Sequence, residues 1–279
     1  MAFKCTPAPK DPVGTLAHKP WAMAIKPFQV APHTFYVSGQ LWVGCYLIDT
    51  GNGLILIDTA IPESLYLLVD SIYELGYNPR EVKKILISHA HFDHCGGAAA
   101  LKKLTGAEIY MSHEDYEFMK ACYDETMIPD SGAHTQDFEP DKFYVFNQPI
   151  CLGDISIVPF HTPGHTPGCT SFIWKVKNPS NGEEYVVGMH GGVGANTMND
   201  EYYARSKYLT PDLRQRFLDD ADKIKKLHVD IALPSHPNQI EIVDRAGKYT
   251  DENQVYLDRT VWADFIDERV RQVRVLMKA

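Results

Sequence analysis

Apolar residues in this chain of 279 residues form two patterns: short runs, and longer stretches with apolar positions every three or four residues. The short runs predict β-strands at about 34–38, 42–49, 53–58, 82–87, 107–111, 143–146, 149–159, 170–177, 184–188 and 229–233. The longer stretches predict α-helices at about 62–75, 97–104, 212–227 and 253–277. Two halves, each of several strands followed by a helix, predict an α/β protein of the αββα sandwich class, with two mixed β-sheets face to face and helices outside.

Turn and cap residues support these boundaries. The run 49–53, Asp-Thr-Gly-Asn-Gly, is typical of a hairpin turn, and the polar segment 178–183 predicts a second hairpin connection. Gly76 marks the end of one helix. Thr210 as cap and Pro211 at the first helical position mark the start of another.

The domain organisation follows from where the regular pattern of apolar residues begins. Residues 1–31 are rich in proline and lysine and irregular, so we expect an N-terminal arm across a single catalytic domain of residues 32–279. The last helix belongs to that domain, and its apolar stripe runs from Val255 to Leu276 at helical spacing. We expect this stripe to face the core. A dimer seam is the alternative, so the protein would be a monomer or a homodimer.

Composition narrows the class of protein. The hydrophobic fraction of 44% and the charged fraction of 23% are ordinary for a globular enzyme, and the net charge of −9 argues against nucleic acid as a partner. No apolar stretch approaches the roughly 20 residues that span a bilayer. We expect a cytoplasmic protein, or a periplasmic or secreted one if a signal segment has been removed, without membrane partners. The six cysteines are scattered, and no disulfide framework is indicated.

The strongest chemical signal is the run His89-Ala90-His91-Phe92-Asp93-His94, followed by Cys-Gly-Gly. Three imidazoles and a carboxylate within six positions are costly to bury for packing alone, whereas both groups are standard ligands for zinc. The run lies between a predicted strand and a small-residue helix. Loops at such positions often carry catalytic or binding residues. The sequence therefore predicts a metal site on this loop.

Two further histidines strengthen the metal hypothesis. His165 lies in His161-Thr-Pro-Gly-His-Thr-Pro-Gly, and His236 lies in Leu233-Pro-Ser-His-Pro, each just past a predicted strand. A lone loop histidine is more often a surface residue than a ligand. Three strand-end loops carrying histidine, one of them with the dense cluster, form a much stronger signal.

These motifs resemble the metallo-β-lactamase superfamily. The HxHxDH loop, the Pro-Gly-His-Thr loop with His165, and an upstream strand ending in Asp58 stand in the family's order, from about Pro32 to about Asp244. The chain most resembles the β-lactamase subclass whose second zinc is held by an aspartate and two histidines. The resemblance also implies the αββα fold.

The resemblance implies two Zn²⁺ cofactors. The first ion would be held by His89, His91 and His165, and the second by Asp93, His94 and His236. Asp58 would brace the cluster loop. Other branches use an aspartate after a later strand to bridge both metals. Here Met189 follows the strand of residues 184–188, which argues against the lactonase, glyoxalase and RNA-processing branches.

Two zinc ions with open positions imply hydrolysis of a small-molecule substrate. A water shared by both ions loses a proton near neutral pH, and the metal-bound hydroxide attacks a carbonyl carbon while Asp93 orients it. The leading hypothesis is a β-lactamase-like hydrolase of an amide or ester, with antibiotic resistance as its consequence. The alternatives are a cytoplasmic hydrolase of a lactone, ester or thioester, and a non-catalytic metal-binding scaffold.

The substrate pocket is expected between the long segments 113–141 and 190–209. The nearest β-lactamase subclass carries serines after the strand that ends here at Gly188, but this chain has none there, which puts β-lactam turnover in doubt. Serine at Gly191 or Gly192 would then be expected to tighten substrate binding. Hydrogen-bond donors that could replace the serines are His190, Asn196, Tyr202, Tyr203 and Tyr208. A seventh metal contact is another hypothesis for His190.

Overall fold

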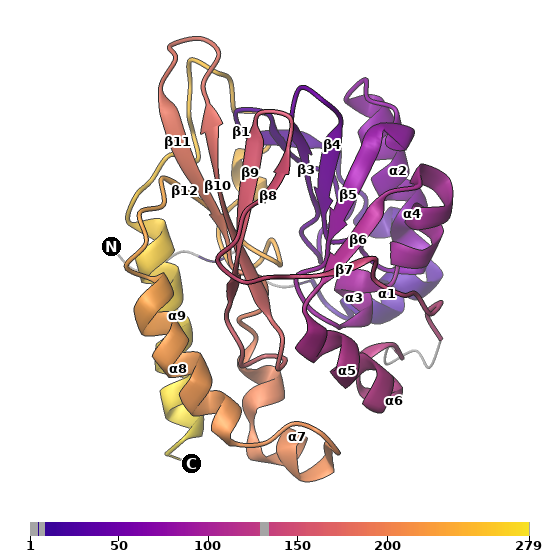
Figure 1. The fold of residues 1–279 in the computed structure, drawn as a ribbon, viewed down its shortest axis with the longest axis vertical. Helices are drawn as coiled ribbons and strands as arrows, with labels where there is room; N and C mark the ends of the chain where they lie inside the picture. Colours follow the sequence, from indigo (N-terminus) through magenta and orange to yellow (C-terminus); the bar gives the residue numbers. More distant parts are fainter. Residues whose placement is uncertain (1–4, 6–8, 129–133, 279) are drawn as a thin grey trace.

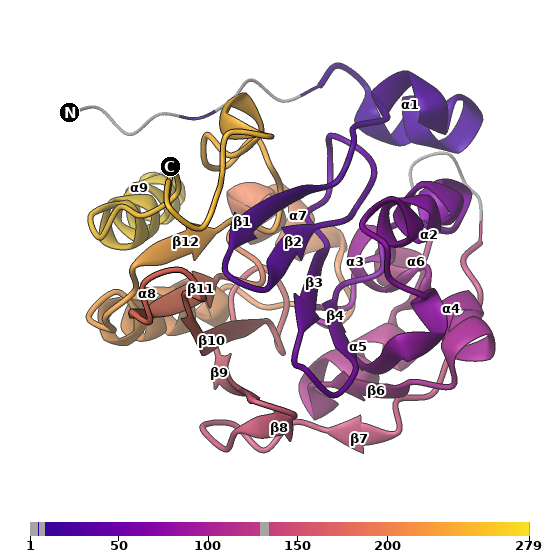
Figure 2. The ribbon, with the colours of Figure 1, turned by 90° about the horizontal axis from the view of Figure 1, so that it is seen from above.

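A computed structural model describes residues 5, 9–128 and 134–278. Two mixed β-sheets stack face to face near the middle of the molecule, and helices cover their outer faces (Figures 1 and 2). The predicted αββα sandwich is therefore confirmed.

The first sheet carries the N-terminal half of the chain. Within the described residues its strand order is β1-β2-β3-β4-β5-β6-β7. Strands β1 to β4 pair antiparallel, and β4 to β7 pair parallel. The strands are β1 (Phe28–Ala31), β2 (Thr34–Tyr36), β3 (Tyr46–Asp49), β4 (Leu54–Ile57), β5 (Val82–Leu86), β6 (Glu108–Met111) and β7 (Lys142–Phe143).

The second sheet carries the C-terminal half, in the order β12-β11-β10-β9-β8 over the described ranges. Strands β8 to β11 form an antiparallel meander, and β12 pairs parallel with β11. The strands are β8 (Ile150–Leu152), β9 (Ile155–His161), β10 (Thr170–Lys177), β11 (Glu184–Met189) and β12 (Ile231–Leu233).

Helices α2 and α4 cover the first sheet, and α8 and α9 lie side by side on the second (Figure 1). The α-helices are α1 (Pro12–His18), α2 (Leu65–Glu74), α3 (Phe92–Cys95), α4 (Ala98–Thr105), α5 (His113–Ala121), α6 (Tyr123–Thr126), α7 (Asp200–Arg205), α8 (Asp212–Ile224) and α9 (Val261–Leu276). Short 3₁₀ helices are η1 (Pro20–Met23), η2 (Pro62–Ser64), η3 (Pro79–Glu81), η4 (Ala195–Met198) and η5 (Val243–Arg245).

Strand β4 shows how a strand is buried between the layers of the sandwich. All four of its side chains are buried, because one face meets the other sheet and the other meets helices. Ile55 and Ile57 join the apolar cluster that also holds Trp174 of β10, whereas Leu54 and Leu56 join the cluster under the helices. A strand buried on both faces loses the alternation of apolar and polar residues, which is why it reads as a continuous apolar run.

The structure corrects several predicted elements. The predicted arm of residues 1–31 is not irregular throughout, because α1 and η1 form within it and β1 pairs with β2; residues 1–4 and 6–8 of it lie outside the described residues. The predicted strand 149–159 is a hairpin of β8 and β9, since Gly153 adopts a left-handed φ of 51° between them. Pro211, not Thr210, is the cap of α8.

Helix α9 begins at Val261, later than the predicted start at 253, because turns occupy the preceding residues. Its apolar stripe is buried, as expected for a core-facing helix: Trp262, Phe265, Ile266, Val270 and Val273 are all inside. No helix among the described residues is both long enough and apolar enough to cross a bilayer. The six cysteines are free thiols.

Candidate metal centre

The predicted ligands come from loops that meet at one edge of the sandwich. His89 follows β5 and His91 caps α3, while Asp93 and His94 lie within α3. The other two come from the second sheet, His165 from the β9–β10 loop and His236 from the segment after β12. The six residues form two groups of three, within each of which the potential ligand atoms lie within 4.8 Å of one another.

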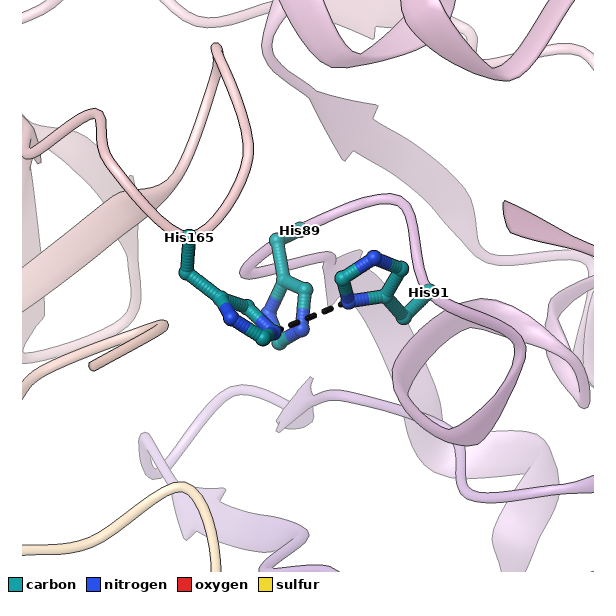
Figure 3. Close-up of side chains that lie close together, drawn as sticks. All are labelled: His89, His91 and His165. Atoms are coloured by element: carbon teal, nitrogen blue, oxygen red, sulfur yellow. Dashed lines mark hydrogen bonds between the residues drawn. The ribbon is translucent and has the colours of Figure 1, made fainter. Parts of the chain in front are cut away.

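The first group is His89, His91 and His165, whose rings point toward a common centre (Figure 3). Nδ1 of His91 lies 2.9 Å from Nε2 of His165. Nε2 of His89 is buried and has no hydrogen-bond partner among the described residues. A tetrahedral zinc ion separates its ligand nitrogens by about 3.3 Å, given Zn–N distances of about 2.0–2.1 Å. These rings therefore fit a zinc ion with little movement.

The second group is Asp93, His94 and His236. Nε2 of His94 lies 3.2 Å from Nε2 of His236, and each of these nitrogens lies 3.6 Å from Oδ2 of Asp93. The two groups adjoin, because the ring centroids of His89 and His94 are only 3.9 Å apart. Two cations bound here could share one ligand between them.

Hydrogen bonds behind the rings fix which nitrogen faces the centre. Nδ1 of His94 donates to Oδ2 of Asp58 at 2.7 Å, and Nδ1 of His236 donates to the carbonyl of Trp42 at 2.6 Å. Nδ1 of His165 donates to the carbonyl of Gly194 at 2.9 Å. A ring that donates from Nδ1 in its neutral form leaves a lone pair on Nε2. The sequence therefore supplies the partners that make these imidazoles metal ligands.

Electrostatics favours a cation at the centre. Burial lowers the pKa of His165 and of His236 to about 4, so both rings are neutral at pH 7. Burial and the neighbouring rings hold the pKa of His89 and His94 well below the usual range. Burial also raises the pKa of Asp93 to about 7. Neutral imidazoles with unused lone pairs, beside a carboxylate that lacks a counter-charge, are the donor set that zinc binds.

Asp58 joins β4 to the cluster loop. Its carboxylate accepts hydrogen bonds from the backbone N–H and the hydroxyl of Ser88, both at 2.7 Å, besides the one from His94. Asp58 and Ala60 have left-handed φ values of 60° and 56°, which few non-glycine residues adopt. Between them, the N–H and hydroxyl of Thr59 both donate to the carbonyl of His94. This strained turn holds α3 against the end of β4.

Asp115 is a supporting residue that the sequence reasoning missed. From α5 its carboxylate accepts hydrogen bonds from the N–H of Ala90 at 2.8 Å, the hydroxyl of Thr166 at 2.7 Å and the N–H of Gly168 at 2.6 Å. It therefore ties the cluster loop to the loop of His165. The available signal was Ser112, which caps α5 and precedes two acidic residues in the first turn.

A cavity of about 920 Å³ opens in front of both groups. The predicted wall segments contribute Asp124, Glu125 and Ile128 from one side, and residues 192–197 with Tyr202, Arg205 and Lys207 from the other. These segments are not plain loops, because they contain α5, α6 and α7; residues 129–133 lie outside the described residues. The sequence reasoning missed further lining residues from distant elements: Val13, Trp42, Arg269 and Gln272.

The predicted substrate-binding residues divide into two sets. Asn196 and Tyr202 line the cavity, whereas His190, Tyr203 and Tyr208 are not among its lining residues. His190 is buried and packs against three rings at centroid distances of 6.3–6.4 Å: Phe217, Trp262 and Phe265. Tyr203 is buried under Arg214, and Tyr208 packs on Phe118. The structure thus separates these three side chains from the metal centre.

The structure opposes the expected benefit of serine at Gly191 or Gly192, because a Cβ at either position would meet close neighbours. A Cβ at Gly191 would lie 1.9 Å from the carbonyl oxygen of Thr170, and one at Gly192 would lie 2.5 Å from Sγ of Cys169. Met189 is fully buried in the core between the sheets. The position of the bridging aspartate therefore offers no ligand, whereas His236 meets His94 directly.

Known proteins are similar to this chain in sequence and in architecture. The sequence profile of the metallo-beta-lactamase superfamily matches residues 43–178. The subclass B3 metallo-beta-lactamase BJP-1 of Bradyrhizobium japonicum superposes with a TM-score of 0.80 at 25% identity, covering 94% of this chain and 97% of that one. This chain carries a metallo-beta-lactamase superfamily domain. Members of this superfamily are hydrolases, including β-lactamases and lactonases.

Proteins similar in sequence to part of this chain include a lactonase and a hydroxyacylglutathione hydrolase. An N-acyl homoserine lactonase from a Bacillus species is 30% identical over 165 residues, which are 48% of this chain and 58% of that protein. A hydroxyacylglutathione hydrolase of Haemophilus influenzae is 35% identical over 109 residues, which are 38% of this chain and 49% of that protein. The chain thus spans only about half the length of these curated relatives.

Proposed function

We propose that this protein is a dinuclear zinc hydrolase that opens a cyclic amide or ester, with a β-lactam as the first substrate class to test. The observation that carries the proposal is the pair of three-ligand groups beside one cavity. Three protein ligands per ion leave a coordination position open, which is the pattern of a catalytic site and not of a closed structural one.

Zinc is the proposed metal because the donors are five imidazoles and one carboxylate. His89, His91 and His165 would hold one ion, and Asp93, His94 and His236 the other. When bound, zinc supplies a Lewis acid for a carbonyl oxygen and lowers the pKa of water. The carboxylate of Asp93 can accept a hydrogen bond from an attacking water and so orient it toward the substrate.

The cavity suits a substrate with separate apolar and polar parts. Val13, Trp42 and Phe92 offer apolar contact on one side. Asn196 and Tyr202 offer an amide and a phenol to the polar groups of a substrate. These side chains bind and orient the acyl group, while the walls limit the water that reaches it.

A lactone is the second candidate substrate. The lactonase similarity and the lack of room for a serine at Gly191 or Gly192 favour it. Met189 argues against a lactonase-type metal site, because a methionine cannot bridge two metals as the aspartate of that branch does. The two candidates therefore rest on different features of the same site.

A side-by-side assay distinguishes them. The purified protein, with its metal content measured on the same sample, is given a chromogenic cephalosporin, an N-acyl homoserine lactone and an acyl thioester. We expect two zinc ions per chain and hydrolysis of the cyclic amide or the lactone, abolished by a chelator and restored by zinc. Two bound metals with no hydrolysis of any substrate would instead indicate a metal-binding scaffold. A constant single metal per chain would refute the dinuclear site.

A further inference from the structure

Arg269 brings a positive charge from the C-terminal helix to the cavity. Helix α9 lies on the outer face of the second sheet (Figure 1), and Arg269 near its middle lines the cavity together with Gln272. The side chain is half-buried, and its Nε is fully buried with no hydrogen-bond partner among the described residues. A guanidinium is charged at any physiological pH, and because Nε is shut off from solvent, an anion in the cavity could reach only the Nη nitrogens.

Nearby carboxylates do not neutralise Arg269. In the described part of the chain it forms no salt bridge, and the carboxylate of its neighbour Glu268 is engaged by Arg271 at 2.6 Å and by Gln272 at 2.8 Å. The Cys5 thiol is close enough to interact, but burial raises its pKa, so it is neutral at pH 7. Arg269 therefore has no salt bridge among the described residues, and the charge of Glu268 acts on it only from beyond salt-bridge distance.

The other cations of the cavity differ from Arg269. Lys207 is paired with Asp124 at 3.3 Å. Arg205 is exposed and stacks over the ring of Tyr202 at 4.6 Å. An exposed cation is hydrated and needs no partner, whereas a half-buried one without a partner is costly to desolvate. Arg269 is thus the lining cation with the most to gain from an incoming anion.

The guanidinium of Arg269 is held in position. Nη1 donates to Oε1 of Gln272 at 3.2 Å, and the group lies over the ring of Phe265 at 5.3 Å. The amide of Gln272 is in turn held by Glu268. A planar group fixed in this way can offer an N–H of its Nη nitrogens to a carboxylate without losing much side-chain freedom.

Helix α9 also packs against β12, the strand that leads to His236, and Arg269 and His236 line the same cavity. An anion bound to Arg269 would therefore share the cavity with the second ligand group. Such a contact selects substrates by charge and sets their direction in the cavity.

We propose that Arg269 is the specificity-determining residue that binds the carboxylate of an anionic acyl substrate. This inference rests on the proposed hydrolase function and names its substrate class: cyclic amides or esters that carry a carboxylate on one side and an apolar group on the other. The apolar group would face Val13 and Trp42, and the carboxylate would pair with the Nη end of Arg269.

The test compares matched anionic and neutral ligands. Equilibrium binding of phenylacetate and of phenylacetamide is measured on the metal-loaded protein and on the variants Arg269→Gln and Arg269→Lys. We expect the unmodified protein to prefer phenylacetate, Arg269→Gln to weaken its binding roughly tenfold or more, and Arg269→Lys to restore part of it. Binding of phenylacetamide should change little in either variant.

Arg274→Gln is the matched control, since Arg274 lies on the same helix, is exposed and is not among the residues that line the cavity. The same comparison in turnover uses a carboxylate-bearing substrate and its methyl ester, where Arg269→Gln should raise KM for the acid with little effect on kcat. A thermal melt identifies variants that merely unfold. Equal affinity of the unmodified protein for both probes would overturn the inference without reference to any variant.

The outcomes separate the two proposals. If no substrate is hydrolysed but phenylacetate binding depends on Arg269, the hydrolase function fails and the anion site survives. If hydrolysis proceeds but the acid and its methyl ester are hydrolysed equally well, the proposed anion site is refuted and the proposed hydrolase function stands. An equal loss of both probes in Arg269→Gln, or the same loss in Arg274→Gln, would indicate a structural role and overturn the inference.

Discussion

His94 donates its Nδ1 proton to Asp58 across 2.7 Å, and both side chains are completely buried. This contact turns Nε2 of His94 toward Asp93 and His236. The orientation of one metal ligand is therefore determined by a residue at the end of a neighbouring strand, in a left-handed turn that Asp58 itself occupies.

The first prediction concerns this contact. Asp58→Asn removes the negative charge that holds the His94 ring. It also places a donor N–H₂ group among groups that already donate, those of Ser88 and His94. We expect zinc affinity at the second group to fall roughly 10- to 100-fold. Competition with a chromophoric chelator measures it, and Asp70→Asn, an exposed change on α2, is the control. Unchanged affinity in Asp58→Asn would mean that packing alone orients His94.

The second prediction separates the two ligand groups. His165→Ala should weaken the first metal site and His236→Ala the second, because each removes one of three ligands from a different group. Metal content under increasing chelator concentration should show one ion lost early in each variant. His190→Phe is the control, since that ring packs among aromatic residues. If His190→Phe lost a metal and His236→Ala did not, the sixth ligand would be wrongly assigned.

The third prediction concerns space beside the cavity. Gly191→Ser should destabilise the protein by about 1–3 kcal/mol or more, because its Cβ would collide with the carbonyl of Thr170. Ala195→Ser is the matched variant, since Ala195 lines the cavity and is half-buried. Urea unfolding of both variants measures the difference. Equal stability of the two would show that the β10–β11 end can relax around a side chain.

The fourth prediction concerns Asp115, whose pKa is raised to about 6 by burial. Between about pH 4 and pH 6 the unfolded chain ionises at this residue while the folded protein keeps the proton. As pH rises through this window, the free energy of unfolding of the unmodified protein should therefore fall relative to that of Asp115→Asn. The fall should be on the order of 3 kcal/mol, and the difference between the two proteins should be constant at higher pH. Urea unfolding of chelator-treated samples at several pH values measures the difference. A gain with rising pH would show that the three donors outweigh burial.

The strands and the ligand cluster could be predicted because their signals are local. Continuous apolar runs such as Leu54–Ile57 reflect burial on both faces, and the His89–His94 run concentrates four ligands in one loop. The sandwich followed from the order of these elements. Element boundaries were less predictable, as the late start of α9 at Val261 shows, because tertiary packing decides where an apolar stripe becomes helical.

Contacts between distant segments could not be predicted from the sequence. Asp115 and Arg269 carry no motif, and their closeness to the centre depends on how α5 and α9 dock on the sheets. The surroundings of His190 could not be predicted for the same reason. It stands beside ligand-bearing loops in the sequence, yet the backbone after β11 turns its ring away toward α8 and α9.

Each ligand group draws two residues from the first half of the chain and one from the second, His165 in one case and His236 in the other. Two bound ions would thus connect the two sheets at one end as a pair of reversible cross-links. The two halves are otherwise joined by apolar packing and by loops. Metal binding and the docking of the two sheets would then be one coupled equilibrium. In a cell short of zinc, the abundance of this protein would respond as well as its activity, because the metal-free sandwich would open more often to proteases.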